Sequence, residues 1–390
     1  MKIAYIGAAS VDIIASSVPF GCEVPVSRLK YAHGARLVLG LLKRGHEVAV
    51  ITPCEKIANV RKVVSGRCTL YLIPQRRSRY QILTCFSKEV GLMVGCLKEF
   101  KPDVAFPQWL YQYSRVAILG GVPFLSVGRD SPWRVARLMH SFRMWHRSVY
   151  SWLFVSKHVK HLTTISPSML SGLNRWWRHG GKISVIPNAF PSEYICRGVK
   201  AIAPEGKTIL CVTEWNELKN AKTLLRAFAE LRKRHVAWRL IVYGACMKRD
   251  EACGAWMEAN GIPFDGIGLR GYGKQEEIRK ILFEEVDLFC SPTLEESFGM
   301  VFLEAMAQGV PCIGGEKSGA VPWVMGGGGV TCDVTKPEML AECIERLMGD
   351  CDLRKKLSMN GLRRVKDNFD IDKIVETYEK ELEKISKENS

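Results

Sequence analysis

Short apolar runs alternate with segments of helical periodicity along most of the 390 residues, and this alternation restricts the chain to few folds. The opening run, residues 2–7, closes on glycine as a buried parallel strand does. A helix-period segment then leads to a second apolar run at 47–52. Because neighbouring parallel strands need a crossover connection, the order strand, helix, strand predicts open parallel sheets covered by helices. The predicted fold class is α/β.

This alternation occurs twice, which predicts two Rossmann-like lobes that face each other across a cleft. The first series fills residues 1–190 and the second fills residues 208–369. Between them, residues 187–207 hold three prolines, two glycines and few periodic apolar positions, so we place a linker at 191–207. Residues 370–390 are predicted to form a C-terminal helix, which can cross back and pack on the first lobe. Ligands of such sheets lie beyond the carboxyl ends of the strands.

The positive charge of the chain is concentrated in its first half. Residues 1–190 contain 27 Lys and Arg against 8 Asp and Glu, and residues 129–182 contain ten against the single acid Asp130. Aromatic residues are interleaved with these cations: Trp133, Phe142, Trp145, Tyr150, Trp152, Phe154, Trp176 and Trp177. The mixture suits an anionic membrane surface or an anionic acceptor. Two alternatives remain open, namely nucleic-acid binding, for which no signature motif is present, and core aromatics with charges on a solvated face.

Several features predict a cytoplasmic protein, bound at most peripherally to the inner face of the cytoplasmic membrane. No stretch reaches the about 18 apolar residues that a membrane-spanning helix needs. Lys2 is the only basic residue near the start and Asp12 interrupts the apolar stretch, so we expect no signal peptide. The 14 cysteines are scattered without a Cys-x-x-Cys pair, which favours buried thiols in a reducing compartment.

The most informative segment is Glu296-Ser-Phe-Gly-Met-Val-Phe-Leu-Glu304, which follows a predicted buried strand. Gly299 allows close approach of the backbone, and a short helix is expected from Met300. Free N–H groups at such a helix start suit a phosphate, and here they belong to Gly299, Met300 and Val301. Glu304 lies about one turn inside the helix, where its carboxylate can accept bonds from vicinal hydroxyls. Taken alone, the same spacing also fits a capping carboxylate and a solvated helix glutamate.

This segment resembles the Glu-x7-Glu signature of the retaining family-4 glycosyltransferases, also called glycosyl transferases group 1. Ser297 replaces the glycine that usually follows the first glutamate. The likeness extends over most of the second half, including residues 209–228 with Lys219-Asn220 and the stretch Ser318-Gly-Ala-Val-Pro322. Shorter landmarks such as Lys101-Pro-Asp103 follow in order through the first half. The resemblance implies a two-lobe type B fold, with acceptor binding in the first lobe and nucleotide-sugar binding in the second.

The resemblance also implies roles for individual residues. Glu304 would bind the donor ribose, Glu296 would lie near hydroxyls of the transferred sugar, and Lys219 would neutralise the departing diphosphate. Ser297 and the helix-start N–H groups would complete the donor site. Glu214 replaces the arginine usually paired with the lysine, and Lys222 or Arg226 are candidates to compensate.

A second departure from the family lies in the first lobe. Arg129 replaces a histidine that lies near the reacting sugar, and a matching Asp130 follows it. We count both as catalytic candidates: Arg129 would contact donor or acceptor, or else begin the basic surface.

The predicted function is that of a retaining hexosyltransferase that uses a nucleotide-diphosphate sugar and a glycan or lipid-linked acceptor, in polysaccharide or cell-envelope synthesis. We expect no cofactor and no metal, because the triplets Asp350-Cys-Asp352 and Asp370-Ile-Asp372 open predicted helices, where Asp is a good N-cap. We expect no nucleic-acid partner. The alternatives are a nucleotide-sugar epimerase or phosphorylase of the same fold, and a non-enzymatic membrane- or nucleic-acid-binding protein on a degenerate lobe pair.

Overall fold

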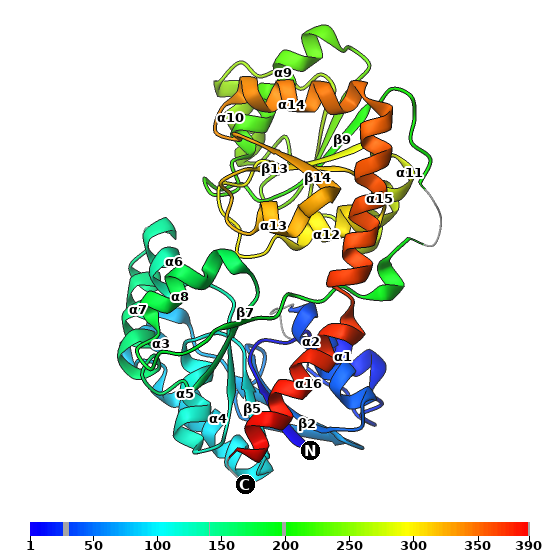
Figure 1. Ribbon diagram of the computed structural model, residues 1–390. Coiled ribbons are helices and arrows are strands. Elements are labelled where there is room, and N and C mark those ends of the chain that lie inside the picture. The colour runs from blue at the N-terminus through cyan, green and yellow to red at the C-terminus, as the bar shows by residue number, and fades with distance from the viewer. Residues whose placement is uncertain (26–30, 140, 197–199, 389–390) are drawn as a thin grey trace. The chain divides into compact units, whose positions relative to one another are not determined.

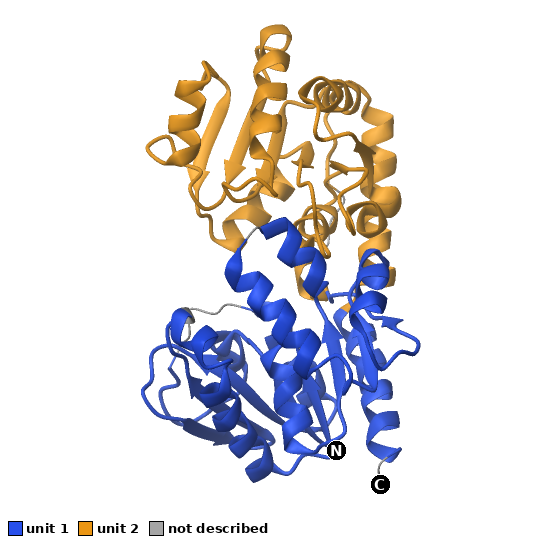
Figure 2. Cartoon of the chain, turned by 90° about the vertical axis from the view of Figure 1, so that its left-hand side faces the viewer, with its two compact units in different colours: residues 1–189, 371–390 blue, residues 190–370 orange. Residues whose placement is uncertain are grey.

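The computed structural model describes residues 1–25, 31–139, 141–196 and 200–388, which form two compact units (Figure 2). Unit 1 contains Met1–Ala189 together with Ile371–Ser390, and unit 2 contains Phe190–Asp370. Each unit has a parallel sheet with helices on both faces, so the predicted α/β class is confirmed (Figure 1). No helix within the described ranges combines the length and apolarity needed to cross a bilayer.

Unit 1 is built on a sheet with the strand order β3-β4-β2-β1-β5, parallel except at β3. Isolated bridges from Ala105 to Phe124 and from Gln108 to Val127 connect its β5 edge to a second set, β6-β7-β8. The strands are β1 Lys2–Ile6, β2 Glu47–Cys54, β3 Arg61–Ser65, β4 Cys68–Pro74, β5 Val104–Pro107, β6 Leu125–Gly128, β7 His161–Thr164 and β8 Ser184–Val185. Strands β1, β2 and β4 are almost entirely buried, as apolar runs between two helical layers must be.

Helices cover both faces of this sheet. The helices of unit 1 are α1 Val11–Ser17, α2 Ala32–Lys43, α3 Ser78–Leu83, α4 Ser87–Phe100, α5 Gln112–Gly120, α6 Pro132–Met139, α7 Phe142–Phe154, α8 Leu170–Trp176 and α16 Ile371–Lys387. Side chains of α4 and α5 share a core with Ala4, Ile6 and Ile51. The opposite face meets α16, where the rings of Phe106 and Tyr378 lie 4.9 Å apart.

The C-terminal helix α16 is held to unit 1 by polar contacts as well as apolar ones. Glu379 accepts hydrogen bonds from Arg44 at 2.5 Å and pairs with His46 at 2.6 Å. The Tyr378 hydroxyl donates to the carbonyl of Ile186 at 3.5 Å. Residues 371–388 therefore belong to the first unit although they follow the second unit in the sequence.

Unit 2 has a fully parallel sheet with the strand order β11-β10-β9-β12-β13-β14. Its strands are β9 Thr208–Val212, β10 Arg239–Tyr243, β11 Ile267–Gly271, β12 Leu288–Ser291, β13 Cys312–Gly315 and β14 Gly329–Cys332. The chain adds β10 and β11 on one side of β9, then returns to place β12 on the other side. Strands β9 and β12 therefore flank a topological switch point, where ligands bind in open parallel sheets.

The helices of unit 2 pack on both faces of its sheet. They are α9 Ala221–Arg234, α10 Ala252–Ala259, α11 Gln275–Glu284, α12 Met300–Ala307, α13 Val321–Met325, α14 Pro337–Gly349 and α15 Cys351–Asn368. One face shares a core with α9 and α14 that includes Leu225, Phe228 and Ile344. On the other face Phe289 of β12 meets Phe302 of α12 edge to face at 5.6 Å, which anchors α12 beside the switch point.

Two features differ from the sequence-based expectations. The segment predicted as a linker, 191–207, lies with unit 2: the buried Lys200 donates to the Leu282 carbonyl at 2.9 Å, and the buried Arg354 donates to the Ala203 carbonyl at 2.7 Å. These contacts concern the described part of the segment, residues 191–196 and 200–207. Strands β3 and β4 were not predicted, although β4 is a buried apolar run like the predicted strands; its partner β3 is an exposed edge strand with only Val63 buried. Such a strand lacks the apolar run that marks the buried ones.

Candidate functional site

Two predicted site residues meet at the switch point of unit 2. Lys219 follows β9 and Glu296 follows β12, and these strands are hydrogen-bonded neighbours with Ile209 opposite Leu288. The Lys219 Nζ and a Glu296 carboxylate oxygen form an ion pair. Their side chains are 30% and 15% exposed, so the pair is partly shielded from water. The structure therefore brings together a cation and an anion that are 77 residues apart in sequence.

The loop that carries Lys219 is held by the two asparagines beside it. Asn216 accepts a hydrogen bond from the Lys219 backbone N–H at 2.9 Å. Asn220 has a left-handed φ of 53°, which asparagine tolerates better than most residues. Its side-chain amide donates to the carbonyls of Pro292, at 3.1 Å, and Val334, at 2.7 Å. Asn220 thus fixes the start of α9 to the ends of β12 and β14.

The loops after β9 and β12 are also tied together through the backbone. The Leu218 carbonyl accepts from the Leu294 N–H at 2.7 Å and from the Thr293 hydroxyl at 3.2 Å. The Ser318 hydroxyl donates to the Thr293 carbonyl at 2.5 Å. These contacts limit the relative movement of the loops on which Lys219 and Glu296 stand.

Gly319 determines where Glu296 lies. The Glu296 carbonyl accepts from the Ala320 N–H at 2.9 Å, and Gly319 adopts φ of 61° beneath it. A Cβ at Gly319 would lie 2.4 Å from the Glu296 carbonyl oxygen and 2.5 Å from the Glu295 carboxylate. The sequence singled out the stretch from Ser318 only as a landmark, and the structure assigns it this positioning role.

The start of α12 lies directly after this loop. Gly299 is its N-cap with φ of 90°, and no side chain in the described part of the chain caps the helix. The first backbone N–H groups of any helix have no intrahelical acceptor, and in α12 these include the N–H groups of Met300 and Val301. Phe298 and Phe302 are buried on either side of this turn.

Glu304 lies on α12, half-buried, and its carboxylate accepts a hydrogen bond from the Gln275 side chain at 3.0 Å. Gln275 begins α11 and was not among the predicted site residues. Its position after a loop and before a helix resembles that of Lys219, but a single glutamine carries no distinctive sequence signal.

Glu214, which stands where the resemblance expects an arginine, is exposed. The two proposed substitutes make other contacts. Lys222 pairs with Glu217 at 2.6 Å, and the Arg226 guanidinium lies 4.9 Å from the Trp256 ring centroid. These are local contacts on the outer part of α9 and the neighbouring α10.

Arg129 lies in unit 1, directly after β6, and only 4% of it is exposed. Its guanidinium donates to Gln108 at 2.9 Å and to Asn188 at 2.6 Å, and lies 5.1 Å from the Tyr31 ring centroid. Arg129 is therefore a buried, oriented cation and does not begin an exposed basic surface. Burial lowers the pKa of nearby His33 well below its usual value, and the charge of Arg129 lowers it further.

Asp130 is tied to the same unit by different partners. It accepts a hydrogen bond from the Tyr111 hydroxyl at 2.9 Å, and the Arg147 guanidinium lies 4.2 Å from the Tyr111 ring centroid. Burial raises the pKa of Asp130, although Arg147 and the Tyr111 hydrogen bond both oppose that rise. Arg129 and Asp130 are adjacent in sequence but belong to separate hydrogen-bond networks.

The Asp-x-Asp triplets make structural contacts. Asp350, the first residue of its triplet, caps α15 by accepting from the Leu353 N–H at 2.8 Å. Asp370 accepts from the Ser192 hydroxyl at 2.7 Å. Across the described ranges, no three His, Cys, Asp or Glu residues are placed to hold a metal ion.

Comparison with protein families matches both parts of the chain. The family described as Glycosyltransferase Family 4 matches residues 32–194, and the family described as Glycosyl transferases group 1 matches residues 196–364. The two matches cover most of unit 1 and most of unit 2.

Curated relatives match over shorter stretches. The N-acetyl-alpha-D-glucosaminyl L-malate synthase of Bacillus anthracis is 29% identical over 180 residues, covering 46% of this chain and 45% of that protein. The lipopolysaccharide core biosynthesis glycosyltransferase LpsE of Rhizobium meliloti is 31% identical over 112 residues, covering 28% and 32%. The chain thus spans less than half the length of these relatives.

Solved structures match over nearly the whole chain. Sucrose-phosphate synthase from Thermosynechococcus elongatus has a TM-score of 0.77 at 16% identity, with 99% of each chain covered. Anabaena HepE, solved in complex with UDP-glucose, has a TM-score of 0.68 at 14% identity, with coverage of 98% and 100%. At such identities the likeness establishes the fold.

Proposed function

Because this chain belongs to the family-4, group 1 glycosyltransferases and has their two-lobe type B fold, we propose that it is a retaining hexosyltransferase. The donor is a nucleoside diphosphate sugar, bound by unit 2. The acceptor is a glycan or lipid-linked molecule, bound by unit 1, in polysaccharide or cell-envelope synthesis. A relative named for lipopolysaccharide core biosynthesis and a neighbour solved with UDP-glucose support this setting and this donor class.

The observation that carries the proposal is the Lys219–Glu296 ion pair beside the start of α12. A diphosphate at the switch point would meet the free N–H groups of the helix start and the ammonium of Lys219. Glu304 would accept bonds from the ribose hydroxyls. When the donor binds, its diphosphate must share Lys219 with the Glu296 carboxylate or displace that carboxylate from Lys219. In either case Glu296 would lie close to the hydroxyls of the donor sugar.

The proposed chemistry needs no protein nucleophile. The acceptor hydroxyl attacks the anomeric carbon on the face from which the diphosphate leaves, so the configuration is retained. The carbon–oxygen bond to the diphosphate breaks as the new glycosidic bond forms, and the acceptor proton passes to a departing diphosphate oxygen. Lys219 stabilises the negative charge that develops there.

The described part of unit 1 exposes an apolar helix face that suits a lipid-linked acceptor. On α7 the side chains of Phe142, Trp145, Val149 and Leu153 are between 41% and 77% exposed. Their spacing of three or four residues places them on one side of the helix. Together with the basic excess of this half, such a face favours contact with an anionic membrane. The buried Trp176 shows that some aromatics of the basic stretch do serve the core.

Thermal unfolding with UDP, GDP, ADP and CMP, each in magnesium and in EDTA, tests the donor assignment. At a ligand concentration of about 100 Kd, binding adds about 2.7 kcal/mol to the free energy of unfolding, a shift of several degrees for units of this size. We expect one nucleoside diphosphate to stabilise the protein equally with and without metal. A folded protein that responds to none of the four contradicts the proposal.

A further inference from the structure

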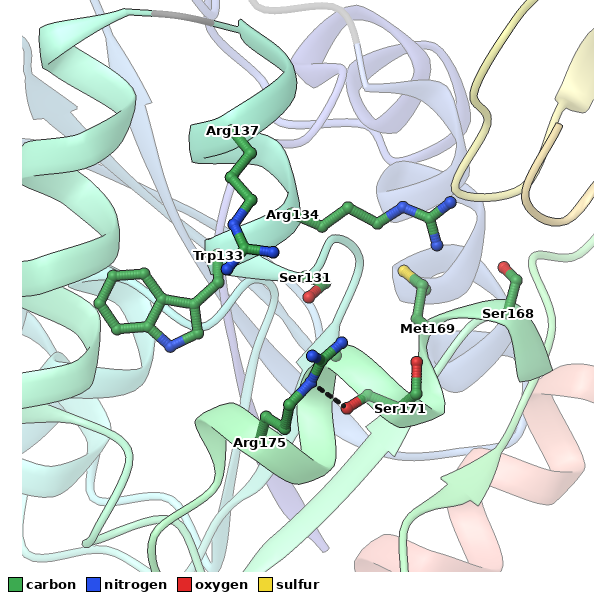
Figure 3. A pocket seen from close by; sticks show the side chains of 9 residues that line it. Ser131, Trp133, Arg134, Arg137, Ser168, Met169, Ser171 and Arg175 are labelled. Carbon is green, nitrogen blue, oxygen red and sulfur yellow. Dashed lines mark hydrogen bonds between the residues drawn. The ribbon is translucent and has the colours of Figure 1, made fainter. Parts of the chain in front are cut away.

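We propose that unit 1 contains a phosphate-binding pocket between α6 and α8, which recognises a phosphate group on the acceptor. The inference rests on the proposed function, because it names a chemical class for the acceptor. The cavity has a volume of about 270 Å³ and its wall carries Ser131, Arg134, Arg137, Ser168, Gly172 and Arg175 (Figure 3). All of these residues belong to unit 1.

The wall of the pocket is strongly basic. Three of its nine lining residues are arginines and none is acidic. Arg134 and Arg137 stand one turn apart on α6, while Arg175 projects from α8 on the other side (Figure 3). Among the described residues, neither Arg137 nor Arg175 pairs with a carboxylate, although Arg175 donates to the Ser171 carbonyl at 3.3 Å. Guanidinium forks from two sides match the oxygens of a phosphate.

A buried hydroxyl in the same wall lacks a partner. Ser131 is 3% exposed, and its Oγ has no hydrogen-bond partner among the described residues. The hydroxyl is accommodated because residue 172 is glycine, where a Cβ would lie only 2.2 Å from it. A buried hydroxyl is normally hydrogen-bonded, so an oxygen of a bound ligand is the partner that the site lacks.

The size and lining of the pocket limit what it accepts. At about 270 Å³ the pocket lies just below the size of about 300 Å³ at which pockets for small ligands begin, so it suits a small group such as a phosphate, and the rest of a larger acceptor would extend outside it. Trp133 also contributes to the lining, and its ring packs near those of Trp145 and Trp152 on α7, with centroids 6.3 and 6.2 Å away. Because the proposed acceptor is a glycan or a lipid-linked molecule, the ligand class is a phosphorylated sugar or polyol, either free or as the head group of a lipid.

Binding of inorganic phosphate to the full-length protein, measured by calorimetry at constant ionic strength, tests the site. We expect Arg137→Gln and Arg175→Gln each to weaken binding by about tenfold or more, because each removes charged hydrogen bonds. The Ser131 hydroxyl makes no hydrogen bond to the described protein, so Ser131→Ala should keep the wild-type Tm while it weakens phosphate binding. Arg178→Gln is the matched control, since Arg178 is exposed, three residues from Arg175, and outside the wall.

The outcomes separate this site from the proposed donor site. UDP binding, measured on the same proteins, should be unchanged in the pocket variants. Wild-type protein that binds phosphate but not UDP would refute the proposed function and leave the phosphate pocket standing. Wild-type protein that does not bind phosphate, or equal losses in Arg178→Gln and Arg175→Gln, overturns the phosphate pocket.

The source of the phosphate is distinguished by two further probes. If it belongs to a lipid, Arg137→Gln reduces flotation with vesicles that contain phosphatidylinositol 4-phosphate. If it belongs to a soluble sugar, the variant lowers affinity for glucose 6-phosphate and leaves flotation unchanged. A variant that alters neither overturns the assignment to an acceptor phosphate.

Discussion

Replacing Lys219 by glutamine should lower kcat/KM strongly while leaving the fold intact. Glutamine is one atom shorter than lysine but keeps a polar N–H donor on the side chain that faces Glu296. What disappears is the positive charge that faces the departing diphosphate. Two unit charges about 4 Å apart interact by about 4 kcal/mol at an effective dielectric constant of 20.

The exposure of the Lys219 side chain reduces this value. Since 30% of it is exposed, we take about 2 to 3 kcal/mol as the loss, which corresponds to about 30- to 150-fold in kcat/KM. The affinity for the nucleoside diphosphate should fall less, because in the unliganded protein Lys219 must first give up part of its pairing with Glu296.

The assay is the steady-state release of nucleoside diphosphate from the donor that thermal unfolding identifies. Lys222→Gln is the matched control: its side chain is 33% exposed and also paired with a glutamate, Glu217, but it lies outside the switch point. Lys219→Arg, which restores the charge, should recover part of the activity. An equal effect of Lys219→Gln and Lys222→Gln, or no effect of either, refutes the role assigned to the ion pair.

Further predictions concern other parts of the molecule. Gly319→Ala should lower the Tm and weaken nucleotide binding, because its Cβ would lie 2.4 Å from the Glu296 carbonyl and its φ of 61° costs an alanine about 1 to 3 kcal/mol. Phe142→Ser should reduce flotation with anionic liposomes, whereas Val236→Ser, 73% exposed in unit 2, should not. Burial alone raises the pKa of Glu379, but its hydrogen bonds with a histidine and an arginine outweigh this and leave the pKa below its usual value. The stability from these contacts is present above the unfolded pKa of about 4.3 and is lost as the pH falls through the lower folded pKa, so Glu379→Gln should flatten the acid limb of a stability–pH curve.

Local patterns in the sequence were sufficient to predict the fold class and most of the buried strands, although strands β3 and β4 were not predicted. Apolar runs closing on glycine or proline mark buried strands because a strand between two helical layers has no polar face. The Glu296-to-Glu304 segment predicted a phosphate-binding helix start because a helix leaves its first N–H groups without acceptors whatever surrounds it. These inferences need only neighbours in sequence.

Contacts between distant residues were decided by the tertiary structure. The pairing of Lys219 with Glu296 depends on β9 and β12 being neighbours, and the buried setting of Arg129 depends on Gln108 and Asn188 converging on it. The arginine pocket likewise needs α6 and α8 to pack side by side. Sequence periodicity specifies which face of an element is apolar, but not which element covers it, and the polar side chains of a site meet only once that packing is complete.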